Sequence, residues 1–106
     1  MAAVSAAREL NPEKPVEVEV ESTEQLQKAI DAGADIVMLD NFDLSTMKKA
    51  VLTADRHLQL EASGGIDDST IVSIAECGVD FISIGAITKH CKAIDLSMRF
   101  VDAFHR

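Results

Sequence analysis

Carboxylate side chains occur in two stretches of the sequence where they could bind ribose hydroxyl groups or a hydrated Mg²⁺ ion. Three valines alternate with three glutamates at residues 16–21, and Asp40 directly follows the apolar residues 36–39. If these stretches are neighbouring parallel strands, Glu19 and Asp40 lie at the edge of the sheet where ligands commonly bind. Mg²⁺ typically uses one or two protein carboxylates and keeps several waters. We therefore predict that Glu19 and Asp40 bind ribose hydroxyls or Mg²⁺, the metal directly or through water; the alternatives are that Asp40 only leaves the core for water or begins a turn.

A Ser-Gly-Gly sequence at residues 63–65 is the best local indication of an anion-binding site. Glycines allow a tight turn that directs consecutive N–H groups at an anion, and the N-terminus of a following helix adds positive potential. A further glycine ends the fourth predicted strand, and two basic residues follow it; the alternative is an ordinary turn and a solvated loop. The predicted phosphate site comprises Ser63, Gly64, Gly65, Gly85, Lys89 and His90.

Further polar residues share the predicted face of Glu19. Alternate residues of a strand point to the same side, so Glu17 and Glu21 share a face with Glu19, and Glu61 shares one with Ser63. If those faces line the inside of a barrel, the carboxylates need cations, hydroxyl groups or water. For Glu17 and Glu61 we expect a structural role, through water bridges or through partners on strands that this sequence does not include.

Four strands that alternate with helices are needed to bring these residues together. Strands are predicted to begin near residues 16, 36, 58 and 81, and the second should be covered on both faces because its apolar run is continuous. An Ala-rich helix is predicted over residues 2–10, and residues 95–100 alternate like a further strand. Three more helices follow the first three strands, with these residues as predicted caps: Ser22, Ser45, and Asp67 or Asp68.

An internal repeat supports a parallel sheet. Residues 29–40 align without gaps to residues 74–85, and each copy reads helix, glycine, one residue, aspartate, strand. Such units form parallel sheets with right-handed crossovers, and no Rossmann glycine fingerprint follows the first strand. We predict an α/β fold of four parallel βα units, about half of an eight-stranded TIM-like barrel. Its open edges and uncovered face should seek partners, so we expect a homodimer or a higher homo-oligomer.

Composition excludes several classes of function. The 106 residues carry a net charge of −8 and include neither Tyr nor Trp, which argues against nucleic acid and acidic membranes as partners. No apolar run approaches the ~20 residues of a membrane span, and the N-terminus lacks a signal-peptide pattern. Cys77 and Cys91 do not make a disulfide framework, so a reducing cytoplasm is the expected location.

The segments VEVEVES, AGADIVMLDNF, LEASGGI and GVDFISIGAITKH, followed by AIDLSMRF, resemble in this order the C-terminal part of bacterial quinolinate phosphoribosyltransferases. The resemblance covers nearly the whole chain. It implies an incomplete α/β barrel of the type II phosphoribosyltransferase class, preceded in the family by an α/β sandwich domain, with active sites formed in a dimer. It also implies conversion of quinolinate and phosphoribosyl pyrophosphate to nicotinate mononucleotide, pyrophosphate and CO₂, with Mg²⁺, in NAD biosynthesis.

The resemblance implies roles for the residues singled out above. In the family, the glutamate and aspartate that match Glu19 and Asp40 lie by the ribose hydroxyls and Mg²⁺, so these two are the expected catalytic residues. Carboxylates there would stabilise the cation-like sugar of ribosyl transfer. The Ser-Gly-Gly that matches residues 63–65, with the glycine at the fourth strand end, holds the 5′-phosphate. The position of Lys89 is often histidine in the family, and here His90 follows it, so either residue could reach the phosphate.

The resemblance also implies what this chain lacks. The family's quinolinate-binding Arg, Lys and His residues come from strands and a domain upstream of the matching segment. Residues 1–106 are therefore expected to be a single partial domain, the C-terminal portion of the barrel, without the sandwich domain and the first barrel strands, and inactive alone. Two alternatives remain: another phosphate-binding barrel enzyme, similar to thiamine phosphate synthase, and a non-catalytic half barrel that self-associates.

Overall fold

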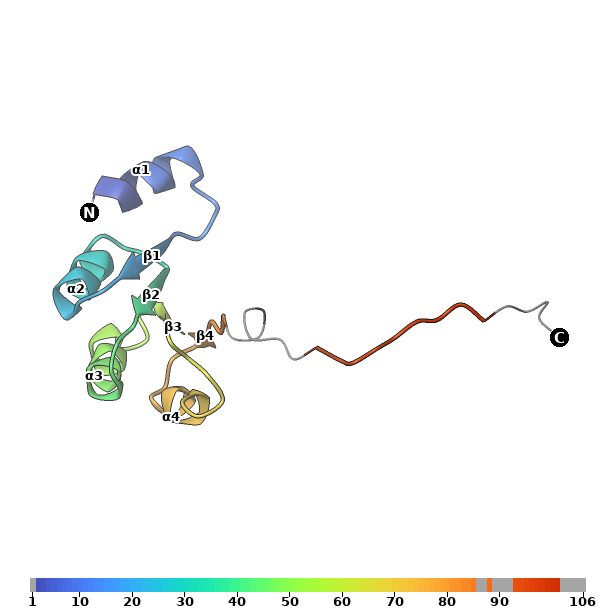
Figure 1. Ribbon diagram of the computed structural model, residues 1–106. Coiled ribbons are helices and arrows are strands. Elements are labelled where there is room, and N and C mark those ends of the chain that lie inside the picture. The colour runs from blue at the N-terminus through green and yellow to red at the C-terminus, as the bar shows by residue number, and fades with distance from the viewer. Residues whose placement is uncertain (1, 86–87, 89–92, 102–106) are drawn as a thin grey trace.

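The computed structural model describes residues 2–85, 88 and 93–101. Four parallel strands form one sheet in the order β1-β2-β3-β4, and they alternate with helices along the chain, which confirms the predicted α/β class (Figure 1). Within the described residues, no helix is both long and apolar enough to cross a membrane. The strands are β1 (Glu17–Val20), β2 (Ile36–Asp40), β3 (Gln59–Ser63) and β4 (Phe81–Ile82), and the helices are α1 (Ala2–Leu10), α2 (Thr23–Asp31), α3 (Leu44–Ala54) and α4 (Ile71–Glu76).

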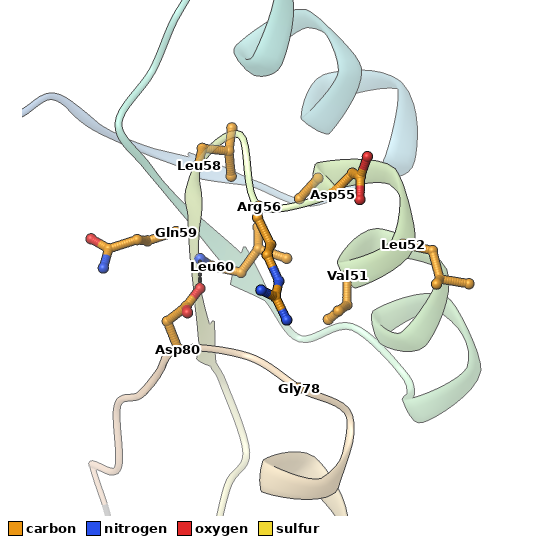
Figure 2. A pocket seen from close by; sticks show the side chains of 10 residues that line it. Val51, Leu52, Asp55, Arg56, Leu58, Gln59, Leu60, Gly78 and Asp80 are labelled. Atoms are coloured by element: carbon orange, nitrogen blue, oxygen red, sulfur yellow. Dashed lines mark hydrogen bonds between the residues drawn. The ribbon is translucent and has the colours of Figure 1, made fainter.

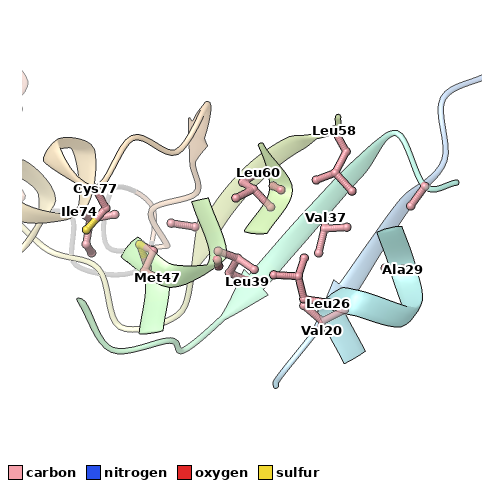
Figure 3. Packing of buried hydrophobic residues seen from close by; sticks show 14 of the residues in the cluster. Val20, Leu26, Ala29, Val37, Leu39, Met47, Leu58, Leu60, Ile74 and Cys77 are labelled. Atoms are coloured by element: carbon pink, nitrogen blue, oxygen red, sulfur yellow. The ribbon is translucent and has the colours of Figure 1, made fainter. Parts of the chain in front are cut away.

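The hydrophobic core lies between one face of the sheet and the helices that connect the strands. Val20, Val37, Leu39 and Leu60 are at most 2% exposed. They belong to one cluster with helix residues such as Leu26 (Figure 3). Burial of such apolar side chains is the main favourable contribution to folding. The valine side of β1 therefore faces the helices, and the glutamate side faces away from them.

The other face of the sheet, here called the open face, is not covered by the described elements. Ile36 and Met38 of β2 are only half-buried there. The prediction that both faces of this strand are covered is therefore wrong for the described chain, because the helices that could bury it all pack on one side. The strand residues of the open face are Glu17, Glu19, Ile36, Met38, Asp40, Gln59, Glu61, Ser63 and Phe81.

The internal repeat has a structural basis in two aspartates. Asp35, just before β2, accepts a hydrogen bond from the backbone N–H of Val16 at 2.7 Å, and Asp80, just before β4, accepts one from Leu60 at 2.8 Å. Each aspartate thereby ties the start of its strand to the preceding strand. The Val16 N–H, and then the guanidinium of Arg8 at 3.0 Å, hold the pKa of Asp35 below its ordinary value. The aspartate of the repeat thus fixes where consecutive strands begin.

The caps of α2 and α3 show one correct and one wrong prediction. Ser22 caps α2, since its side chain accepts from the N–H of Gln25 at 3.2 Å. Asp43, not Ser45, caps α3: its carboxylate accepts from the N–H of Thr46 at 2.7 Å. The Ser45 hydroxyl donates to the same carboxylate at 2.9 Å. Aspartate and serine are about equally good caps, and Asp43 is the one that directly precedes the first residue of α3.

Residues 95–100 form no strand in the structure, although their sequence alternates like one. The described segment 93–101 extends away from the sheet without regular secondary structure (Figure 1). Its apolar side chains are open to solvent; Leu96 is 84% exposed and Met98 is 92% exposed. A strand needs a neighbour to accept its backbone hydrogen bonds, and no described element pairs with this segment. Alternation alone cannot supply that neighbour.

Candidate functional site

The carboxyl ends of the first three strands bring the predicted ribose and metal ligands to one edge of the open face. Asp40 and Ser63 are register partners on β2 and β3, so they lie side by side. Glu19 pairs with Met38 in the register of β1 and β2, which places it diagonally across from Asp40 on the same face. Asp40 and Ser63 are half-buried and Glu19 is exposed. Three polar side chains from three strands therefore line this edge.

The loop after β3, residues 63–65 and here called the glycine loop, presents backbone donors beside Asp40. Gly64 and Gly65 have φ angles of +90° and +63°. Within the described part of the chain, the backbone N–H groups of Gly64, Gly65 and Ile66 donate no hydrogen bond. Consecutive unpaired N–H groups in such a turn can bind an anion. The glycine loop therefore presents three unpaired donors at this edge, and phosphate binding by them stays a prediction.

Gly64 also has a steric reason to be glycine. A Cβ at this position would lie 3.0 Å from the backbone nitrogen of Asn41 and 3.0 Å from Oδ1 of Asp40. The Asn41 N–H donates to the carbonyl oxygen of Ser63 at 2.8 Å. Gly65 has more room, since its Cβ would meet only Oδ1 of Asn41, at 3.9 Å. Contact between the loops after β2 and β3 thus requires glycine at position 64, whether or not a phosphate binds.

The helix that follows the glycine loop begins too late to contribute to the anion site. α4 begins at Ile71 and is six residues long; its N-cap is Thr70, which makes no side-chain cap bond. The prediction of Asp67 or Asp68 as the cap is therefore wrong. Hydrogen bonds from the hydroxyl and N–H groups of Ser69, at 2.6 Å and 2.9 Å, instead hold the pKa of Asp67 below its ordinary value. Asp67 shapes a turn, which leaves the glycine loop itself as the source of donors.

The fourth strand end contributes Gly85. β3 and β4 are parallel neighbours, so Gly85 leaves the sheet at the same edge as the glycine loop. A Cβ at Gly85 would have no atom within 4 Å, so packing of the described chain does not require glycine there. The N–H and hydroxyl groups of Thr88 donate to the Gly85 carbonyl oxygen at 3.2 Å and 3.1 Å. Lys89 and His90, which were also predicted to bind phosphate, lie outside the described residues.

A carboxyl pair spans three strands on the same open face. Glu17 of β1 and Glu61 of β3 share a hydrogen bond, and this bond, followed by burial and the Glu61 charge, raises the pKa of Glu17 to about 7. The pKa of Glu61 is lowered by its hydrogen bonds with Glu17 and Ser83. The Ser83 hydroxyl donates to the Glu61 carboxylate. The alternation of the sequence predicted that both glutamates lie on polar faces of their strands. It did not predict that Glu61 would bond to Glu17 and to Ser83, because these contacts depend on the register of the strands across the sheet.

The pairing of Glu17 with Glu61 should make the free energy of unfolding depend on pH. Folded Glu17 keeps its proton to about pH 7, whereas the ordinary pKa is 4.5. Between these values the folded state binds more protons than the unfolded state, so the free energy of unfolding should fall as the pH rises from about 5 to 7. Glu17→Gln, which retains a hydrogen-bond donor without titrating, should flatten this dependence in urea denaturation. Glu21→Gln is the control, and equal slopes for both variants would contradict the shared proton.

Glu19 and Asp40 are the residues at this edge that could hold Mg²⁺. Among the described residues, no group of three or more His, Cys, Asp or Glu side chains is arranged to hold a metal ion. Two carboxylates on neighbouring strands nevertheless suit Mg²⁺, which binds few protein groups and completes its shell with water and phosphate oxygens. Zinc would require more protein ligands, usually with nitrogen or sulfur donors. The donor set therefore fits a hydrated Mg²⁺ ion.

A pocket of about 700 Å³ lies at the opposite edge of the sheet. It is formed by the end of α3, the start of β3 and the turn before β4, with Arg56 and Asp80 among its lining residues (Figure 2). The Asp80 carboxylate is already engaged with the N–H of Leu60 at 2.8 Å. None of the predicted site residues lines this pocket, and ligands of barrel enzymes bind at the carboxyl ends of strands. The pocket is therefore separate from the candidate site.

Comparison with known structures supports the barrel architecture. Over 90% of this chain, the nicotinate-nucleotide pyrophosphorylase of Francisella tularensis superposes with a TM-score of 0.83 at 57% sequence identity, and the match covers 34% of that chain. The thiamine phosphate pyrophosphorylase of Pyrococcus furiosus superposes with a TM-score of 0.70 over 76% of this chain and 43% of its own, at 24% identity. At that identity, the second comparison shows a shared fold alone.

Comparison of sequences identifies the family. The family model for the C-terminal domain of quinolinate phosphoribosyl transferase matches residues 1–99. The nicotinate-nucleotide pyrophosphorylase (carboxylating) of Dictyostelium discoideum is 44% identical over 87 residues, which cover 79% of this chain and 29% of that protein. The chain thus spans about a third of the length of the relatives that it matches. From its sequence and its fold, the chain belongs to the quinolinate phosphoribosyltransferase family, whose C-terminal domain it matches.

Proposed function

We propose that this chain supplies the ribose- and phosphate-binding side of a quinolinate phosphoribosyltransferase. Such an enzyme converts quinolinate and phosphoribosyl pyrophosphate to nicotinate mononucleotide, pyrophosphate and CO₂ in NAD biosynthesis. The observation that carries the proposal is the register of Asp40 with Ser63, which sets a carboxylate beside the glycine loop. A phosphate bound to that loop would place its attached sugar next to the carboxylates.

In this proposal, different residues bind different parts of phosphoribosyl pyrophosphate. The N–H groups of the glycine loop bind the 5′-phosphate, and Gly85, with Lys89 or His90, approaches it from the fourth strand end. Glu19 and Asp40 accept hydrogen bonds from the ribose hydroxyls and stabilise positive charge that develops on the sugar. These two carboxylates would hold Mg²⁺, which would supply positive charge to neutralise the departing pyrophosphate.

Cations that would bind the two carboxylates of quinolinate are not part of this face. The strand residues of the open face include four carboxylates and no Lys or Arg, and the whole chain has a net charge of −8. Recognition of a dicarboxylate requires Arg or Lys partners. We therefore propose that residues outside this sequence complete the site, and that the complete enzyme is a homodimer or a higher homo-oligomer in the cytoplasm. The uncovered sheet face and the two open strand edges support such assembly.

The 106-residue chain alone is expected to form no detectable nicotinate mononucleotide from quinolinate, phosphoribosyl pyrophosphate and Mg²⁺. The physical reason is that the described strand residues of its open face include no Lys or Arg that could orient quinolinate for attack by its ring nitrogen and for decarboxylation. Chromatographic detection of the product would test this, with a full-length nicotinate-nucleotide pyrophosphorylase assayed in parallel. Turnover by the isolated chain would show that it needs no further residues.

Binding of ribose 5-phosphate tests the proposed function directly. In ¹H–¹⁵N correlation spectra of the chain, ribose 5-phosphate should shift the amide resonances of Gly64, Gly65 and Ile66, whose N–H groups are unpaired within the described residues. The amides of Asp55 and Arg56, at the opposite edge, are the internal control. Shifts confined to the control residues, or none at all, would count against the assignment. Sedimentation of the same sample tests the scaffold alternative, which expects self-association without ligand binding.

A further inference from the structure

Asn41 adopts a backbone conformation that few side chains tolerate. Its φ angle is +58°, in the left-handed region that asparagine adopts more readily than most residues. The residue lies directly after Asp40, and its N–H donates to the carbonyl oxygen of Ser63 at 2.8 Å. That bond continues the pairing of β2 with β3 by one residue, and the chain then turns away from the sheet. The chain therefore turns directly after Asp40, the predicted ribose ligand and the last residue of β2.

The same residue packs against the glycine loop. A Cβ on Gly64 would lie 3.0 Å from the Asn41 nitrogen and 3.2 Å from its Cα, and a Cβ on Gly65 would lie 3.9 Å from its Oδ1. Asn41 thus lies next to both glycines, and its peptide bond joins it directly to Asp40. A change in the backbone of Asn41 would move the carboxylate and the loop donors relative to each other.

We propose that Asn41 is a positioning residue that sets the spacing between the Asp40 carboxylate and the N–H groups of the glycine loop, and thereby favours sugar phosphates over free phosphate. The inference rests on the proposed function and adds a determinant of specificity to it. A sugar phosphate must meet both groups at once, so its affinity depends on their spacing. Inorganic phosphate binds only to the glycine loop, so its affinity does not depend on the spacing between the loop and the Asp40 carboxylate.

Three variants separate positioning from stability. Asn41→Val replaces asparagine by a β-branched residue that disfavours positive φ, and Asn41→Gly keeps the left-handed backbone without the side chain. Arg56→Val is the matched control, because Arg56 has nearly the same φ angle, +61°, and lies at the opposite edge of the sheet. Calorimetric titration of the full chain with ribose 5-phosphate and with inorganic phosphate, at about 0.15 M salt to screen the lost charge of Arg56, measures both affinities.

Asn41→Val should weaken ribose 5-phosphate binding about tenfold, because the aligned backbone becomes a minor state, and should change phosphate binding about twofold or less. Asn41→Gly and Arg56→Val should retain both affinities. Equal losses for the two ligands, or a loss with Arg56→Val as large as that with Asn41→Val, would overturn the positioning role. If the unmodified chain binds phosphate without preferring ribose 5-phosphate, the proposed ribose site fails and the inference fails with it; if it binds neither, the whole proposed function fails.

Discussion

Gly64→Ala is expected to lower the free energy of unfolding by about 3 kcal/mol, the largest stability effect among the glycine substitutions considered. Gly64 has a φ angle of +90°, which residues with a Cβ rarely adopt. The added carbon would also lie 3.0 Å from the backbone nitrogen of Asn41. Because that neighbour is backbone rather than the end of a flexible side chain, the two loops must separate to admit the carbon. Urea denaturation of the purified variant measures the loss.

Gly33→Ala provides the matched control for this prediction. Gly33 has a similar φ angle, +79°, but a Cβ there would have no atom within 4 Å. Its substitution should therefore cost only the backbone strain, about 1 kcal/mol. Gly85→Ala, at a position with no such contact and no positive φ, should leave stability unchanged. Equal losses for Gly64→Ala and Gly33→Ala would show that contact between the two loops contributes nothing.

Most of the fold could be predicted from the sequence because local patterns determined it. Alternating valines and glutamates at residues 16–21 predicted the position of β1, and the repeated Gly-x-Asp sequence marked where β2 and β4 begin. The errors occur where the outcome depends on a neighbour. Asp43 and Ser45 both suit the role of helix cap, and Asp43 takes it because α3 begins directly after Asp43. Residues 95–100 alternate like a strand, yet no described strand pairs with them.

The candidate site could be predicted only in outline. Parallel strands end at one edge, so the gathering of Glu19, Asp40 and the glycine loop followed from knowing where each strand stops. The contacts between them did not follow from the sequence. The left-handed turn at Asn41 and the carboxyl pair of Glu17 with Glu61 both require the register of one strand against another. A sequence pattern contains the period of each strand but not its offset relative to its neighbour.

Asp40→Ala should weaken ligand binding, and the loss should be larger with Mg²⁺ than without it. The Asp40 carboxylate accepts no hydrogen bond from the described part of the chain, so its removal should change stability little. With Mg²⁺ present, the variant should bind phosphoribosyl pyrophosphate at least tenfold more weakly, roughly the value of one charge-assisted hydrogen bond. Without Mg²⁺, the loss should be smaller, because removing a charge of the same sign as the polyanion offsets part of the lost hydrogen bonding to the ribose hydroxyls.

Asp43→Ala distinguishes a role in the site from a general effect of charge. Asp43 lies three residues after Asp40 and caps α3, so its loss removes the same charge and should cost about 1 kcal/mol of stability. It should leave the Mg²⁺-dependent increase in phosphoribosyl pyrophosphate affinity intact, since its carboxylate bonds to Thr46 and Ser45 rather than facing the glycine loop. Calorimetric titrations with and without Mg²⁺ give this increase for each variant. If Asp40→Ala keeps as much of it as Asp43→Ala does, the carboxylate at the end of β2 does not hold the metal, and Glu19 alone would remain as its ligand.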